Sequence, residues 1–154
     1  MKTLTLVAVL LAAAPVVAKP WQGIEPGQAR RDSVIKKFGE PSRTITQGGK
    51  EIIAYFDQKA IPGTQQVQFT VDPGTQQVER ISVFPGPVVD KESVESTYGP
   101  PCPPGKAPAS ACYQKKITDE FRTYLFYARL GLAVFLNADG KTVQSLTFTA
   151  QSTK

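Results

Sequence analysis

One short pattern occurs twice in this chain, and it constrains the possible folds more than any other feature. Residues 32–41 read DSVIKKFGEP, and residues 92–101 read ESVESTYGPP. Repetition of this kind indicates duplicated supersecondary units that share one core. We therefore predict repeat 1 over residues 19–86 and repeat 2 over residues 87–154, packed together as one compact domain.

Each copy of the pattern predicts a short amphipathic helix. The first helix is expected over residues 29–38, because Val34 and Phe38 lie four residues apart on one helical face. The second is expected over residues 90–98, with Asp90 as its N-cap. Each copy closes with a glycine and a proline after the predicted helix, and these residues end helices.

Alternating apolar residues after each helix predict a three-stranded meander. The expected strands cover residues 51–56, 65–72, 78–84, 120–127, 132–138 and 142–150. Alternation with a period of two gives each sheet one buried face and one wet face. The predicted fold class is α+β, with two tandem αβββ-like repeats, short helices on one face of an antiparallel sheet and the opposite face available to a partner.

The first eighteen residues have the composition of a secretory signal peptide. Lys2 precedes an apolar run over residues 4–17, and small residues stand where a signal peptidase reads the chain before Lys19. We expect residues 1–18 to be removed and the product to be exported to the periplasm or the cell exterior. No second apolar run of about twenty residues follows, so no integral membrane segment is expected.

The two cysteines, Cys102 and Cys112, flank a short proline-rich loop. In an exported chain such a pair predicts a disulfide. The chain has no histidine to complete a zinc site. We therefore expect a structural role for the pair and no metal.

Residue types needed for catalysis are missing or weakly placed. Without histidine, the chain cannot form a Ser-His-Asp or Cys-His nucleophile. The acidic pair at 119–120 is more typical of a turn than of an acid and base pair, and no glycine-rich phosphate loop is present. The net charge of +5 lacks a dense basic cluster, so nucleic acid is not an expected partner. The sequence predicts a binding protein without a cofactor, not an enzyme.

Repeat 2 predicts an apolar surface on the face that is polar in repeat 1. We align Phe135 with Phe69, which places Val134 and Leu136 at positions that repeat 1 fills with glutamine and threonine. A contiguous apolar patch on a solvent face indicates a site for a protein partner. The alternative is that this patch packs against the cysteine loop, the other repeat or a second copy. The predicted partner-binding residues are Tyr124, Phe126, Leu132, Val134 and Leu136.

The segment 26–41 resembles the helix signature of the SmpA/OmlA family, the small outer-membrane lipoprotein subunit of the β-barrel assembly machinery. The similarity extends to residues 55–56, to 62–66 and to the strand that ends at Val83. The family implies an envelope scaffold or adaptor, although Lys19 stands where a lipoprotein has its lipidated cysteine.

The tandem duplication is also similar to the secreted β-lactamase inhibitor protein family. In repeat 2 a cysteine follows shortly after the glycine that ends the helix, as it does in that family. This second resemblance implies an inhibitor of an extracellular enzyme. A third expectation, from the aromatic residues alone, is a carrier of a small molecule or lipid.

Overall fold

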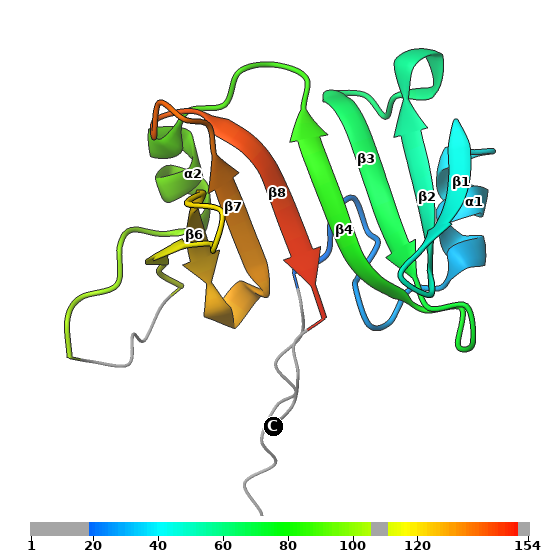
Figure 1. The fold of residues 1–154 in the computed structure, drawn as a ribbon, viewed down its shortest axis with the longest axis horizontal. Helices are drawn as coiled ribbons and strands as arrows, with labels where there is room; N and C mark the ends of the chain where they lie inside the picture. Colours follow the sequence, from blue (N-terminus) through cyan, green and yellow to red (C-terminus); the bar gives the residue numbers. More distant parts are fainter. Residues whose placement is uncertain (1–18, 106–110, 151–154) are drawn as a thin grey trace, which may run out of the picture.

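The computed structural model describes residues 19–105 and 111–150, and its dominant element is one antiparallel sheet of eight strands (Figure 1). The order across the sheet is β1-β2-β3-β4-β8-β7-β6-β5. The strands are β1 (Arg43–Gln47), β2 (Lys50–Phe56), β3 (Thr64–Val71), β4 (Val78–Pro85), β5 (Gln114–Ile117), β6 (Thr123–Tyr127), β7 (Leu132–Leu136) and β8 (Val143–Thr149). The helices are α1 (Arg31–Phe38) and α2 (Lys91–Tyr98), with single 3-10 turns at Asp57–Lys59 and Ala128–Leu130.

The strand pairings are local, with one exception. Within the described sheet, each pair of neighbours is consecutive in the chain, except β4 and β8. These two strands pair antiparallel, with Ile81 opposite Phe148 and Val83 opposite Leu146. We call this pairing the seam, because it joins the half containing β1 to β4 with the half containing β5 to β8.

The predicted α+β class is wrong, because the structure is mainly β. Only two helices of eight residues accompany the eight strands in the described chain. Each helix is followed by four strands, so the predicted αβββ unit also lacks one strand. The sequence prediction missed β1 and β5.

Both missed strands lie at the edges of the sheet. All five residues of β1 are exposed, and three of the four residues of β5 are exposed. An edge strand with both faces accessible needs no alternation of apolar and polar residues, and edge strands are often short and charged. The period-of-two signal that identifies a half-buried strand is therefore absent from both segments.

The two helices form where their sequence patterns predict them. Helix α1 begins at Arg31, two residues later than expected, and no side chain caps it. Helix α2 is capped by the carboxylate of Asp90, which accepts a hydrogen bond of 2.7 Å from the amide of Ser93. Val34 and Val94 are the buried residues of α1 and α2.

The sheet has one covered face and one open face. The covered face, which we call the helix face, contains a continuous row in which Phe69, Ile81, Phe148 and Leu132 are direct cross-strand neighbours. All four are at most 2% exposed. The opposite, open face is turned toward the viewer in Figure 1, with both helices behind the sheet. Burial of one face accounts for the alternation along the central strands.

A carboxylate organises the turn between β3 and β4. Asp72 accepts hydrogen bonds from the amides of Gly74 and Thr75 and a hydrogen bond of 2.7 Å from the ammonium of Lys50. These hydrogen bonds lower the pKa of Asp72 to about 2. The bond from Lys50 has the largest effect, and the bond from the Thr75 amide has the second largest. Lys50 also pairs with Glu79, so the turn ties β2 to β4.

This turn is expected to lose stability in acid. Because the folded pKa of Asp72 is below its unfolded value, its contribution is complete above about pH 4 and is lost as the pH falls through about 2. Urea unfolding midpoints measured between pH 2 and pH 6 test this. Asp72→Asn should lower the midpoint above pH 4, and its difference from the unmodified protein should shrink toward pH 2. An unchanged difference across this range would contradict the assignment.

Candidate binding site

The five predicted partner-binding residues lie on both faces of the sheet. Leu132, Val134 and Leu136 point to the helix face and are between 0% and 6% exposed. Tyr124 and Phe126 point to the open face and are half-buried. The structure therefore brings Tyr124 and Phe126 together on one surface and places the three residues of β7 in the core.

The split results from a register error of one residue. In the structure Val134 pairs with Leu146, as Phe69 pairs with Ile81, so Val134 occupies the position that we assigned to Phe135. A shift of one residue moves every side chain of a strand to the other face. The turns show the correct alignment. The amide of Asp72 donates to the carbonyl of Gln77, and the amide of Asn137 donates in the same way to the carbonyl of Thr142, so Asn137 corresponds to Asp72.

An aromatic patch does lie on the open face, with partly different members. We define the patch as Tyr124, Phe126 and Phe135, which are half-buried side chains of β6 and β7. The rings of Tyr124 and Phe135 stack with their centroids 5.1 Å apart. The ammonium of Lys116 lies 4.5 Å from the ring centre of Phe126, and the guanidinium of Arg122 lies 5.0 Å from that of Phe135.

The hairpin that joins β5 to β6 adds an exposed aromatic residue just before the strand that carries Tyr124 and Phe126. Phe121 is 89% exposed and has a φ of 58°, in the left-handed region that favours glycine. Its amide donates to the carbonyl of Thr118, and the amide of Arg122 donates to the Thr118 hydroxyl. The turn therefore holds a large apolar side chain in solvent at a backbone cost of order 1 kcal/mol.

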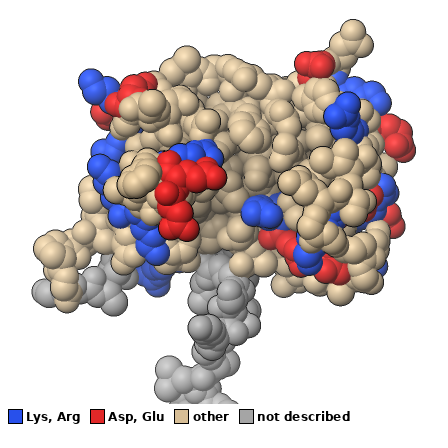
Figure 2. Space-filling view, viewed as in Figure 1, with Lys and Arg blue, Asp and Glu red and all other residues tan. Residues whose placement is uncertain are grey.

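Figure 2 shows how charge is arranged on this side of the molecule. Acidic and basic side chains gather mainly toward the two ends of the sheet, and uncharged residues cover most of the area between them. Within the open face, Thr70 and Arg80 of the first half stand opposite each other. On the same face, Ile52 and Phe56 of β2 pair with Thr70 and Gln66, so the open face of the first half mixes polar and apolar residues.

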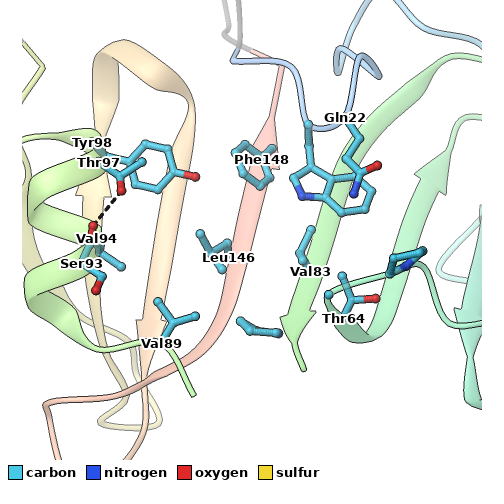
Figure 3. Close-up of a pocket in the computed structure, with 14 residues that line it drawn as sticks. Gln22, Thr64, Val83, Val89, Ser93, Val94, Thr97, Tyr98, Leu146 and Phe148 are labelled. Atoms are coloured by element: carbon cyan, nitrogen blue, oxygen red, sulfur yellow. Dashed lines mark hydrogen bonds between the residues drawn. The ribbon is translucent and has the colours of Figure 1, made fainter. Parts of the chain in front are cut away.

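A second candidate site is a cleft on the helix face, directly over the seam. It has a volume of about 280 Å³. Its floor consists of Val83 from β4 with Leu146 and Phe148 from β8, as Figure 3 shows. Helix α2 forms one wall, and the N-terminal segment and the start of β3 form the other. The remaining lining residues are Trp21, Gln22, Pro62, Gly63, Thr64, Pro85, Val89, Ser93, Val94, Thr97 and Tyr98.

The N-terminal segment crosses the seam and places Trp21 at the cleft. The amides of Trp21 and Ile24 donate to each other's carbonyls at 2.9 Å, which closes a tight turn. The Trp21 ring lies 6.2 Å from the ring of Phe69 in the first half. The backbone amide of Lys19 donates to Leu130 of the second half, and its ammonium lies 4.6 Å from the ring centre of Tyr98.

The opposite wall is supported by a hydrogen-bonded tyrosine cluster beneath α2. The Tyr127 hydroxyl donates to the carbonyl of Gly99 at 2.9 Å, and the Tyr113 hydroxyl donates to Glu95 at 2.6 Å. Tyr98 packs on Tyr127 with ring centres 5.9 Å apart. Burial raises the pKa of Tyr98, so its hydroxyl is neutral at physiological pH. The wall therefore presents an uncharged aromatic ring to the cleft.

The predicted disulfide is confirmed, because Cys102 and Cys112 are bonded with their Cα atoms 4.9 Å apart. The amide of Cys102 donates to the carbonyl of Tyr113, which ties the start of the loop to the strand region before β5. Residues 106–110 of this loop lie outside the described part of the chain, as do residues 1–18, on which the signal-peptide prediction falls.

No group of three or more histidine, cysteine or acidic side chains in residues 19–105 and 111–150 is placed to hold a metal. Among the same residues, no helix has the length and apolar character needed to cross a bilayer.

No protein-family model and no curated protein matches this sequence. Among solved structures, a DUF4309 family protein, YjgB, from Bacillus subtilis has a similar fold, with a TM-score of 0.53 and 17% identity over 84% of each chain. An extracellular protein containing an SCP domain from Bacillus anthracis aligns with a TM-score of 0.49 and 14% identity, over 94% of this chain and 50% of that one. The chain thus spans half the length of the second protein, and the similarity to the first concerns the fold alone.

Proposed function

We propose that this protein is an exported, non-catalytic binding protein that holds a protein partner on the open face of its sheet. The observation that carries the proposal is the aromatic patch. Tyr124, Phe126 and Phe135 are half-buried on a sheet face that no described helix covers. Aromatic residues and arginine are enriched at protein interfaces, and they supply most of the binding energy there.

The two cations beside the patch support the same proposal. Lys116 and Arg122 lie over aromatic rings, so their alkyl and planar groups extend the contact surface while their charges stay at its rim. Phe121 stands next to Arg122 as a projecting apolar side chain. An apolar centre with a charged rim favours a protein surface over a bare lipid surface, and the acidic pair at 119–120 weakens attraction to anionic lipid.

Export is supported by the disulfide, because such bonds persist in oxidising compartments. The composition of residues 1–18 supports it independently. We therefore expect the partner to be a component of the cell envelope, as the resemblance to the SmpA/OmlA family implies. An extracellular enzyme is the alternative partner class, implied by the second resemblance.

A photoreactive aromatic amino acid at position 126 tests the proposal in cells. Benzoyl-phenylalanine replaces Phe126 with a similar ring, so the fold is retained and the probe faces outward on the open face. Discrete cross-linked products are expected at this position, and mass spectrometry would assign them to the envelope or to a secreted enzyme. The control is the same probe at Ser96, which is exposed on α2. Equal products at both positions, or none at position 126, would contradict the proposal.

Side-chain removal gives a quantitative version of this test. The double change Tyr124→Ser and Phe126→Ser should weaken binding of the captured partner at least tenfold, because each aromatic anchor contributes about 1–2 kcal/mol. Both residues are half-buried, so the loss of stability should be smaller than for a core aromatic residue. Titration by surface plasmon resonance, with Ser96→Ala as the control, measures the change. An unchanged dissociation constant would place the interface elsewhere.

A further inference from the structure

We propose that the cleft over the seam binds an uncharged small molecule with an apolar ring system. The inference is independent of the partner proposed for the open face, since the two sites lie on opposite faces of the sheet. The lining of the cleft is uncharged. None of the fourteen residues that line it is aspartate, glutamate, lysine or arginine.

The absence of charge in the lining defines the chemistry of the ligand. A charged group moved from water into an apolar site without a paired charge costs several kcal/mol. Lys19 is not part of the lining, and its ammonium rests on the face of Tyr98, 4.6 Å from the ring centre. The cleft therefore selects against ions and favours a neutral molecule.

The floor and walls indicate the shape of the ligand. Phe148 and Val83 belong to the apolar floor, and Tyr98 adds an aromatic ring from α2, as Figure 3 shows. Trp21 of the N-terminal segment adds a second aromatic ring to the lining. Aromatic rings pack well against other ring systems. The volume of about 280 Å³ lies near the lower limit for ligand pockets, which are commonly about 300 to 1,000 Å³. This size fits a small ring compound better than a helix or a folded segment.

Few polar groups in the cleft are free to bind such a molecule. The hydroxyls of Thr64 and Thr97 donate to carbonyls of the protein itself, at 2.7 Å each. The side-chain amide of Gln22 and the hydroxyl of Tyr98 make no hydrogen bond to another residue in the described part of the chain. One or two hydrogen-bonding groups on the ligand would match these two side chains.

The backbone at the edge of the cleft supports a functional role. Gln22 has a φ of 47°, in the left-handed region, and the turn at 21–24 places Trp21 against the cleft. A glutamine in this conformation costs more than a glycine would, and such costs concentrate at ligand sites. The turn thus holds an aromatic ring and an amide together at one wall.

A matched pair of dyes tests the ligand class. N-phenyl-1-naphthylamine is neutral, whereas 1-anilinonaphthalene-8-sulfonate has the same rings and a negative charge. The neutral dye should bind with a micromolar dissociation constant, measured by its fluorescence under direct excitation, and the sulfonate should bind at least tenfold more weakly. Equal affinities would overturn the assignment to uncharged ligands, and absence of neutral-dye binding at 100 micromolar would overturn the site.

Variants on α2 test the location. Thr97→Trp fills the cleft from an exposed helix position and should weaken neutral-dye binding at least tenfold. Ser96→Trp is the control, because Ser96 is also exposed, makes the same kind of hydrogen bond to the preceding turn and does not line the cleft. Phe126→Ser on the open face should leave the affinity unchanged. Loss of binding in Phe126→Ser with normal binding in Thr97→Trp would assign the dye to the aromatic patch and overturn the proposal.

Discussion

Replacing Phe69 with alanine is expected to lower the free energy of unfolding by about 4 kcal/mol, the largest effect we predict for a single change. The Phe69 side chain is fully buried at the centre of the helix face. Its ring contacts three others, with centroid distances of 5.7 Å to Phe38, 6.0 Å to Tyr55 and 6.2 Å to Trp21. Alanine would leave a cavity that three aromatic rings cannot easily collapse into.

Urea unfolding followed by tryptophan emission measures this change, because Trp21 is the sole tryptophan and packs beside Phe69. The matched control is Phe121→Ala. Phe121 has the same side chain but is 89% exposed, so its removal should change stability by less than about 0.5 kcal/mol. A loss below about 1 kcal/mol in Phe69→Ala would mean that the aromatic cluster does not anchor the core.

Removing the disulfide should cost about 3 kcal/mol. The bond between Cys102 and Cys112 closes a loop with a sequence separation of 10, and the chain-entropy estimate for such a loop is about 2.8 kcal/mol. The bond also fixes the start of the segment that positions Tyr113, whose hydroxyl binds Glu95 of α2. The stability of the second half should therefore depend on it more than that of the first half.

The double change Cys102→Ser and Cys112→Ser tests this expectation by urea unfolding under oxidising and reducing conditions. The unmodified protein should lose about 3 kcal/mol on addition of a reductant. The double variant should show no further response to the reductant and should match the reduced protein. An unmodified protein whose midpoint is the same in both conditions would contradict the prediction.

Local patterns were sufficient to predict most elements of this fold. The spacing of Val34 and Phe38 correctly predicted helix α1, and Asp90 correctly predicted the start of helix α2. The alternation along β3 and β4 gave central strands, because burial of one face requires it. The edge strands β1 and β5 have no buried face, so they lack that signal, and the class prediction was wrong because their residues were not counted as sheet.

The candidate sites were predictable only in part. Tyr124 and Phe126 were identified from composition, but Phe135 was assigned to the wrong face because the alignment relied on matching phenylalanines. The cleft was not predictable by local reasoning. Trp21 and Tyr98 are remote in sequence, and they line one cleft only because β4 pairs with β8. Nothing in either residue's neighbourhood indicates that pairing.

The seam has a consequence for how the chain reaches this fold. Every other strand pairing closes a short loop, whereas the seam must bring together segments separated by the whole second half. The entropy of loop closure is therefore concentrated in this one pairing. The connection over residues 86–88 is exposed, and a chain cut there would leave two meanders whose matching edges are β4 and β8. We expect such fragments to associate through these two edges. Neutral-dye binding in the cleft would detect the association, because the lining of the cleft comes from both fragments.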